Sequence, residues 1–187
     1  MTLIFPAGRV SLALRGLACL LGVLLAAAPQ AGEPVDYEVL ALDTLNGGLA
    51  FVGLDRFPDM ALEPRLDAPG VESVERRVLR TPEEWRGFWE RVQGELGTLG
   101  RNLPLDFGRY MVIVSAAGRH AFEGGATYVM DVDASDAELV VSIEETPASC
   151  PGPSATLSPL AVIRVERSTK PVRFEVETLP CPDTGSR

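Results

Sequence analysis

The sequence of 187 residues contains a single histidine, His120, and only three cysteines. A hydrolytic triad needs a base within hydrogen-bond reach of a nucleophile, and a third group that orients the base. No Gly-x-Ser-x-Gly element or similar nucleophile motif accompanies His120. A hydrolase that uses His120 is therefore the third and lowest-ranked of the hypotheses developed here, and we expect no catalytic residue.

The same scarcity argues against metal and nucleotide sites. Structural zinc takes four nitrogen or sulfur ligands, and no glycine pattern follows a strand and opens a helix, as a nucleotide-binding loop requires. The acidic run 131–138 resembles a calcium loop, but Asp136 stands where glycine is needed and Ser142 where a bidentate glutamate is needed. We expect no cofactor, and keep a small-molecule or metal-binding sensor that uses this acidic turn as the alternative function.

Long apolar runs are also scarce, and the longest, Leu17 to Ala28, lies near the N-terminus. Arg9 and Arg15 precede it, and no acidic residue occurs before Glu33. This is the order of a secretory signal peptide. The run has twelve residues, whereas a membrane-spanning helix needs about 20. The run therefore favours a cleavable signal over a permanent anchor.

We expect residues 1–31 to be the signal peptide, cut after the alanines at 26–28 or near Ala31. Residues 32–187 then form one periplasmic or secreted domain, which is the usual size for a single core. An uncleaved anchor and a lipoprotein attached through Cys19 are the alternatives.

The chain that remains is strongly acidic. Two of the 17 Lys and Arg lie in residues 1–31 and none of the 26 Asp and Glu does, so 15 basic residues face 26 acidic ones and the net charge is −11. Such a charge repels phosphate backbones and anionic lipid headgroups. We therefore expect neither nucleic acid nor a membrane surface as a partner, and no stable membrane insertion after signal cleavage.

Two cysteines, Cys150 and Cys181, remain after the signal. An even pair in an oxidising compartment predicts a disulfide bond. Closing a loop of this length stabilises the fold by about 3.5 kcal/mol in the loop-entropy model.

The clearest predicted element is an amphipathic helix over 81–96. Thr81 can cap its N-terminus, Pro82 suits the first helical position, and Glu84 completes a capping box. One apolar stripe then follows at helical spacing: Trp85, Phe88, Trp89, Val92 and Leu96. We expect this stripe to pack on a sheet rather than to bind a partner, and the glycines at 94, 97 and 100 to end the helix.

The rest of the chain alternates between strand and turn signals. A hairpin is predicted over 36–57, because Asn46, Gly47 and Gly48 separate two apolar segments. Further strands are expected near 71–79, 110–115, 127–132, 138–144, 160–165 and 172–178, with loops at 118–125 and 146–158. Since no strand–helix–strand rhythm appears, we predict an α+β domain with a mostly antiparallel sheet of about seven strands and the one helix.

Several of these segments follow a familiar order. Arg80–Trp89 (RTPEEWRGFW) is followed by Leu103–Phe107 (LPLDF), then the strand Met111–Val114 (MVIV), a glycine pair, a strand hairpin and a Ser-Pro before another strand. From about residue 78 to residue 177 the chain resembles the C-terminal domain family of the protease-complex subunit PrcB. The hairpin 36–57 resembles the lead-in that some members have.

The resemblance implies an exported accessory protein that stabilises or binds another exported protein, a protease in the founding case, without catalytic residues of its own. The family loop runs threonine-glycine-glycine directly into a tyrosine. Here Glu123 replaces the threonine, and two further residues stand between the glycine pair and Tyr128. We expect the contact to lie on this loop, with Phe122 as anchor, or on an exposed strand edge. The candidate contact residues are Arg119, His120, Phe122, Glu123, Gly124, Gly125 and Tyr128.

Overall fold

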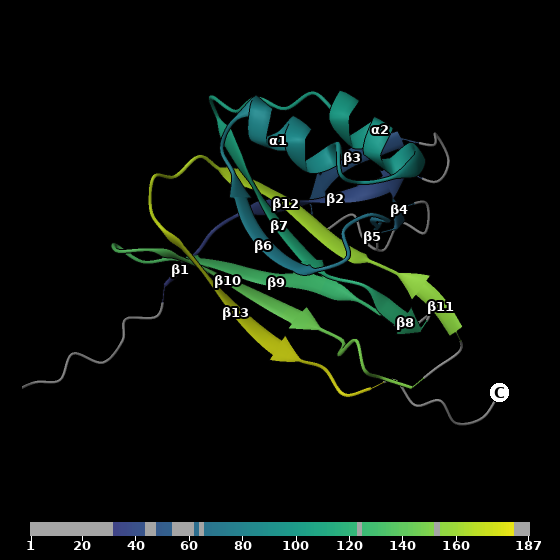
Figure 1. Ribbon diagram of the computed structural model, residues 1–187. Helices are drawn as coiled ribbons and strands as arrows, with labels where there is room; N and C mark the ends of the chain where they lie inside the picture. Colours follow the sequence, from purple (N-terminus) through teal and green to yellow (C-terminus); the bar gives the residue numbers. More distant parts are fainter. Residues whose placement is uncertain are drawn as a thin grey trace, which may run out of the picture. The chain divides into compact units, whose positions relative to one another are not determined.

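The computed structural model describes residues 32–43, 48–53, 62–63, 66–122, 125–151 and 154–181 (Figure 1). The predicted signal peptide lies outside these residues. In chain order the elements are β1 (Glu33–Pro34), β2 (Tyr37–Asp43), β3 (Gly48–Gly53), β4 (Leu62–Glu63), β5 (Leu66–Asp67), β6 (Val74–Leu79), α1 (Pro82–Trp89), α2 (Gly94–Asn102), β7 (Tyr110–Ala117), β8 (His120–Phe122), β9 (Thr127–Ala134), β10 (Leu139–Glu145), β11 (Ser154–Leu157), β12 (Pro159–Glu166) and β13 (Val172–Thr178).

The largest sheet has seven strands, and its main path runs β3-β2-β12-β7-β6, with β4 beside β2 and β5 beside β12. The predicted hairpin over 36–57 corresponds to β2 and β3, which pair antiparallel. The central strands β7 and β12 are buried on both faces, which explains their nearly continuous apolar sequences. This sheet is the middle layer of the domain.

Each face of the seven-stranded sheet packs against a different layer. Along β7, Val112 and Val114 belong to a core shared with the helices, whereas Met111 and Ile113 belong to a second core shared with the four-stranded sheet. Figure 1 shows the same order, with α1 and α2 on one side and β9, β10 and β13 on the other. The two cores follow from the alternation of side chains along a strand.

The predicted helix over 81–96 is two helices. The capping box of α1 is confirmed, since the amide of Glu84 donates to Thr81 Oγ1 (3.2 Å) and the amide of Thr81 donates to Glu84 Oε2 (3.1 Å). The helix ends at Trp89, and Gly94 opens α2 with a φ of +76°. The expectation that the glycines end the helix was therefore wrong for Gly97 and Gly100.

Close packing explains these two glycines. A Cβ on Gly100 would lie 2.1 Å from Cδ2 of the Trp89 indole, and one on Gly97 would lie 2.0 Å from the Val92 carbonyl oxygen. The absent side chains let α2 approach α1 and its buried tryptophan. The apolar stripe itself is core, as expected, because Trp85, Phe88 and Trp89 are buried.

The four-stranded sheet has the order β1-β9-β10-β13. The predicted hairpin near 127–144 is confirmed as the antiparallel pair β9 and β10, but β13 pairs with β10 in parallel. A register shift between Ser142 and Ile143 leaves Met130 as an extra residue on β9. The Tyr37 hydroxyl donates to the carbonyl oxygens of Val129 (3.2 Å) and Met130 (2.9 Å), so these backbone acceptors at the bulge have a hydrogen-bond partner.

The α+β class and the largely antiparallel pairing are confirmed, but the single sheet of about seven strands is wrong. The strands divide between two large sheets and a two-stranded ribbon of β8 and β11. That ribbon occupies segments predicted as the loops 118–125 and 146–158. These strands are short and lack clear alternation, so their pairing depends on distant contacts that a local pattern does not encode.

Candidate functional site

The predicted contact loop is partly internal. Arg119 is exposed, and its amide donates to the carbonyl oxygen of Glu72 (3.0 Å) beside β6. His120, on β8, is 0% exposed and belongs to the core. A fully buried imidazole cannot reach a substrate or a partner surface without rearrangement, so His120 supports neither the hydrolase hypothesis nor a direct contact.

Gly125 has a structural reason to be glycine. A Cβ at this position would lie 2.6 Å from Nδ1 of His120. The backbone therefore approaches the imidazole more closely than any other residue type permits. The backbone of Phe122 pairs with Ser154, while the Phe122 side chain, Glu123 and Gly124 lie outside the described part of the molecule. The proposed anchor role of Phe122 stays a prediction.

Tyr128 belongs to a different surface. It lies half-buried on β9, directly opposite Glu144 of β10, and its neighbours Thr127 and Val129 are buried. By alternation its side chain lies on the outer face of the four-stranded sheet. The described contact residues therefore do not share one surface: His120 and Gly125 are buried, Arg119 is exposed beside β6, and Tyr128 lies on the outer face.

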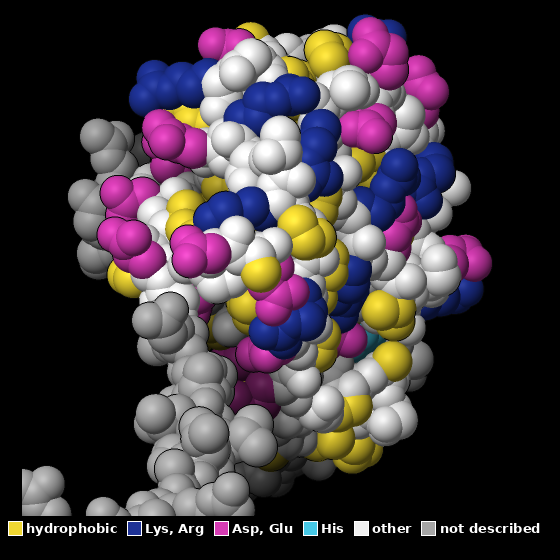
Figure 2. Space-filling view, turned by 90° about the vertical axis from the view of Figure 1, so that its left-hand side faces the viewer, with side chains coloured by type: hydrophobic (Ala, Val, Ile, Leu, Met, Phe, Trp, Pro, Cys, Tyr) yellow, Lys and Arg dark blue, Asp and Glu magenta, His cyan; other side chains and the backbone are white. Residues whose placement is uncertain are grey.

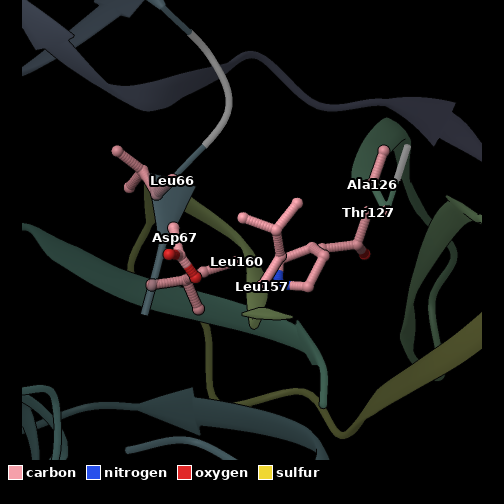
Figure 3. A pocket seen from close by; sticks show the side chains of 8 residues that line it. Leu66, Asp67, Ala126, Thr127, Leu157 and Leu160 are labelled. Atoms are coloured by element: carbon pink, nitrogen blue, oxygen red, sulfur yellow. The ribbon is translucent and has the colours of Figure 1, made fainter. Parts of the chain in front are cut away.

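A cavity of about 200 Å³ lies next to Gly125 (Figure 3). Its polar side chains already serve the fold: Asp67 Oδ1 accepts from the amide of Ser158 (2.7 Å), and the hydroxyls of Thr127 and Ser115 are 3.0 Å apart. Pockets for small ligands usually measure about 300–1,000 Å³. This cavity suits one apolar side chain better than a metabolite. Its lining is Leu66, Asp67, Gly125, Ala126, Thr127, Leu157, Pro159 and Leu160.

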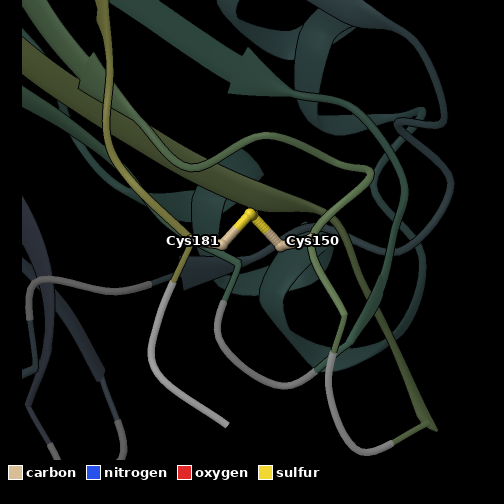
Figure 4. The surroundings of a disulfide bond; sticks show 2 residues. All are labelled: Cys150 and Cys181. Carbon is tan, nitrogen blue, oxygen red and sulfur yellow. A yellow bond between two sulfur atoms is a disulfide. The ribbon is translucent and has the colours of Figure 1, made fainter.

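The predicted disulfide is present between Cys150 and Cys181, whose Cα atoms are 5.3 Å apart (Figure 4). Cys150 follows β10 and Cys181 follows β13, so the bond joins the chain just beyond the ends of two paired strands. The amide of Leu179 also donates to the carbonyl oxygen of Glu145 (2.9 Å). The end of β13 is therefore fixed covalently and by backbone pairing.

The acidic turn 131–138 is closed by its own polar groups. The Ser135 hydroxyl accepts from the amides of Ala137 (3.3 Å) and Glu138 (3.1 Å), and Lys170 Nζ donates to the Ser135 carbonyl oxygen. The lysine ammonium therefore already interacts with an oxygen that a bound cation would use. The described side chains also contain no cluster of three potential metal ligands. These contacts lend no support to the sensor alternative.

The strongest candidate surface is the open edge of β13. Among the described strands only β10 pairs with it. The Leu139 amide bonds to the Pro171 carbonyl oxygen (2.9 Å), and the Leu179 amide to that of Glu145. In a parallel pair the residues that bond to the partner alternate. Backbone groups of the even-numbered residues therefore point away from the sheet, at Val172, Phe174, Val176 and Thr178.

The outer face beside this edge is acidic. In the register of β10 and β13, Ser142 is next to Glu175 and Glu144 is next to Glu177. Glu175 accepts from Arg173, but no described cation pairs with Glu144 or Glu177. A hollow of about 220 Å³ lies among these carboxylates, and Met130, which is 50% exposed, contributes to its lining. This face presents negative charge around a small apolar floor.

Another side of the domain looks different. Figure 2 shows basic and acidic side chains interspersed there. Elsewhere in the domain, partly buried carboxylates are paired with guanidinium groups, as in Arg76–Glu145 and Arg164–Glu38. The uncompensated carboxylates of the outer face are therefore a local arrangement, and the overall acidity of the chain does not by itself produce them.

Comparison with known proteins gives no match among family models, curated proteins or solved structures. The resemblance to the PrcB C-terminal domain family therefore rests on the order of sequence motifs alone. In the described part of the chain, none of the helices has the length and apolarity to cross a bilayer.

Sequence reasoning named an exposed strand edge as a contact but did not identify β13. A usable signal was present, because the sequence 172–178 (VRFEVET) carries charged residues at every second position. A strand with a charged face is typical of a sheet edge or an exposed face. The parallel pairing with β10, which makes β13 the edge, had no local signal.

Proposed function

We propose that this protein is a non-enzymatic, exported accessory protein that binds another exported protein, and that β13 is the contact. In line with the family resemblance, we propose a protease as the class of partner. The observation that carries the proposal is the solvent-accessible edge of β13, with which no described strand pairs. An extended segment of a partner can join such an edge through main-chain hydrogen bonds.

The edge is well prepared for this role. Both of its ends are fixed, one by the Pro171 pairing and the other by the Cys150–Cys181 disulfide. A strand that is already ordered loses little conformational entropy when a partner pairs with it. Val176, in the middle of the edge, is 48% exposed, so the partner can also cover apolar surface.

Capture of the native partner from the exported fraction of the source cells tests the proposal. The bait is the purified protein, compared with Val176→Pro and Val176→Ala. Proline at 176 removes an outward-facing N–H but no hydrogen bond to β10, whereas alanine keeps the N–H. We expect the wild type and Val176→Ala to retain a partner that Val176→Pro loses, at closely similar melting temperatures.

Equal capture by a folded Val176→Pro would place the contact elsewhere. Failure of the wild type to enrich any protein over an unrelated acidic bait would refute a binding function. Casein hydrolysis by the captured fraction tests the narrower assignment of a protease as partner.

Export is testable separately. Mass spectrometry of the protein from the exported fraction should show an N-terminus between residues 27 and 35. An intact Met1, or a diacylglyceryl mass on Cys19, would refute the cleavable signal in favour of one of its alternatives.

A further inference from the structure

We infer that the segment which joins β13 is an amphipathic strand in which basic and apolar residues alternate. This inference rests on the proposed function, because it assigns a chemistry to the partner of the same edge. The evidence comes from the outer and inner faces of the four-stranded sheet, because a strand added beside β13 would extend both.

The outer face selects for basic residues. A strand added beside β13 would place every second side chain next to Glu175 and Glu177, with Glu144 one strand further in. Arginine or lysine at these positions would pair with the carboxylates, and its aliphatic stem could lie against Met130 in the hollow.

The inner face selects for apolar residues. Val172 and Phe174 on β13 pack against the core between the sheets, and Val176 continues their row with half of its surface exposed. Apolar side chains of an added strand would extend that row. The edge thus matches a segment with a two-residue period of basic and apolar positions.

The neighbouring carboxylates also destabilise the free protein. Glu144 and Glu177 are direct neighbours in the sheet, and like charges in that position destabilise the pairing of two strands. A basic partner would remove this repulsion. A second copy of the same edge would add more carboxylates, and its one cation on this strand, Arg173, already pairs with Glu138 and Glu175. A heterologous basic segment therefore fits better than self-association.

Fluorescence anisotropy with synthetic peptides tests the inference on the purified protein. The probe is a seven-residue peptide of alternating lysine and valine. One comparison peptide replaces lysine by glutamate, and another is N-methylated at every second amide. We expect only the unmethylated lysine peptide to bind, with an affinity that falls as salt rises.

Two double variants, each of which removes two negative charges, distinguish an effect of the carboxylates at the site from an effect of the protein's net charge. Glu144→Gln with Glu177→Gln should weaken peptide binding about tenfold, the sum of two partly exposed ion pairs, while the melting temperature stays equal or rises. Glu72→Gln with Glu90→Gln alters exposed acidic residues elsewhere and should leave binding unchanged.

Several results would overturn the inference. Binding of the N-methylated peptide at full affinity would indicate adsorption to a charged face, and equal binding of the glutamate peptide would remove the charge preference. A dimer in sedimentation velocity that Val176→Pro dissociates would make a second copy the occupant. The native partner could also be captured through β13 although no lysine peptide binds or competes. In that case the inferred alternation of basic and apolar residues in the partner is wrong, while the proposed function stands.

Discussion

The helix-covered face of the seven-stranded sheet and the outer face of the four-stranded sheet are built from different residues. On the first, the rings of Trp85, Phe88 and Trp89 pack edge-on, with centroids 5.2–5.3 Å apart. On the second, Glu144 and Glu177 lie side by side in solvent without a described cation. Burial of large rings stabilises a fold, whereas neighbouring carboxylates do not. The comparison places the large buried rings in one layer and the proposed recognition surface in the other.

The largest effect should come from removing the centre of the helix-covered face. Trp89→Ala should lower the free energy of unfolding by about 3–5 kcal/mol, because it leaves a large cavity between α1, α2 and the sheet. Urea denaturation followed by circular dichroism measures this. A folded Trp89→Ala with unchanged stability and impaired partner binding would reverse the comparison and make the aromatic face the interface.

The disulfide should have the next largest effect, on the four-stranded side. Replacing Cys150 and Cys181 by serine should destabilise the domain by about 3.5 kcal/mol and lower its melting temperature by several degrees. We also expect amide hydrogen exchange to quicken most in β13, whose end the bond secures. Two free thiols in the unfolded, unreduced protein would show that the bond does not form.

Glycines in α1 and α2 offer a matched pair of substitutions. Gly100→Ala should cost about 1–3 kcal/mol, because its Cβ would overlap the Trp89 ring. Gly87→Ala, on the exposed side of α1 with no atom within 4 Å of the new Cβ, should instead stabilise the protein by about 0.5–1 kcal/mol. Equal effects in thermal melts would mean that the two helices do not pack closely.

The smallest effect concerns the ion pair that ties the end of α1 to β6. Burial alone would raise the pKa of the Glu75 carboxyl, but hydrogen bonds and charge from Arg91 and Arg77 outweigh it and hold that pKa below its usual range. The stabilisation is therefore complete above the unfolded pKa of about 4.3 and is lost as the pH falls through the lower folded value.

Glu75→Gln should accordingly reduce stability by at most about 1 kcal/mol at neutral pH, and the difference from wild type should vanish in acid. Stability curves of both proteins between pH 2 and pH 7 measure this. A difference that persists at the lowest pH would mean that Glu75 acts through packing and not through charge.

The sequence predicted the local features of the fold well. The capping box at Thr81, the apolar stripe at Trp85 and the disulfide were all readable from spacing and composition. The predictions that failed concerned features that depend on contacts between residues far apart in the sequence. Gly100 looked like a helix terminator because its contact with Trp89 is tertiary, and β8 looked like a loop because its partner β11 is far along the chain.

The candidate site divided in the same way. The glycine at 125 does mark a close backbone approach, and the group that it approaches is the His120 ring of the same chain. Gly124 lies outside the described residues, and a contact role for this loop stays a prediction. The general idea of a strand edge was available from sequence. Its location on β13 required the knowledge that a C-terminal strand crosses back to pair in parallel with β10.

That crossing has a consequence for how the edge arises during synthesis. β10 ends at Glu145, but its neighbour β13 begins only at Val172, after the chain has built β11 and β12 elsewhere. Until β13 has left the ribosome, this sheet ends at β10, and the proposed acidic binding edge does not exist. A chain that stops before Val172 would therefore display a different, more apolar edge, so a partner selective for β13 would recognise only chains that include this strand.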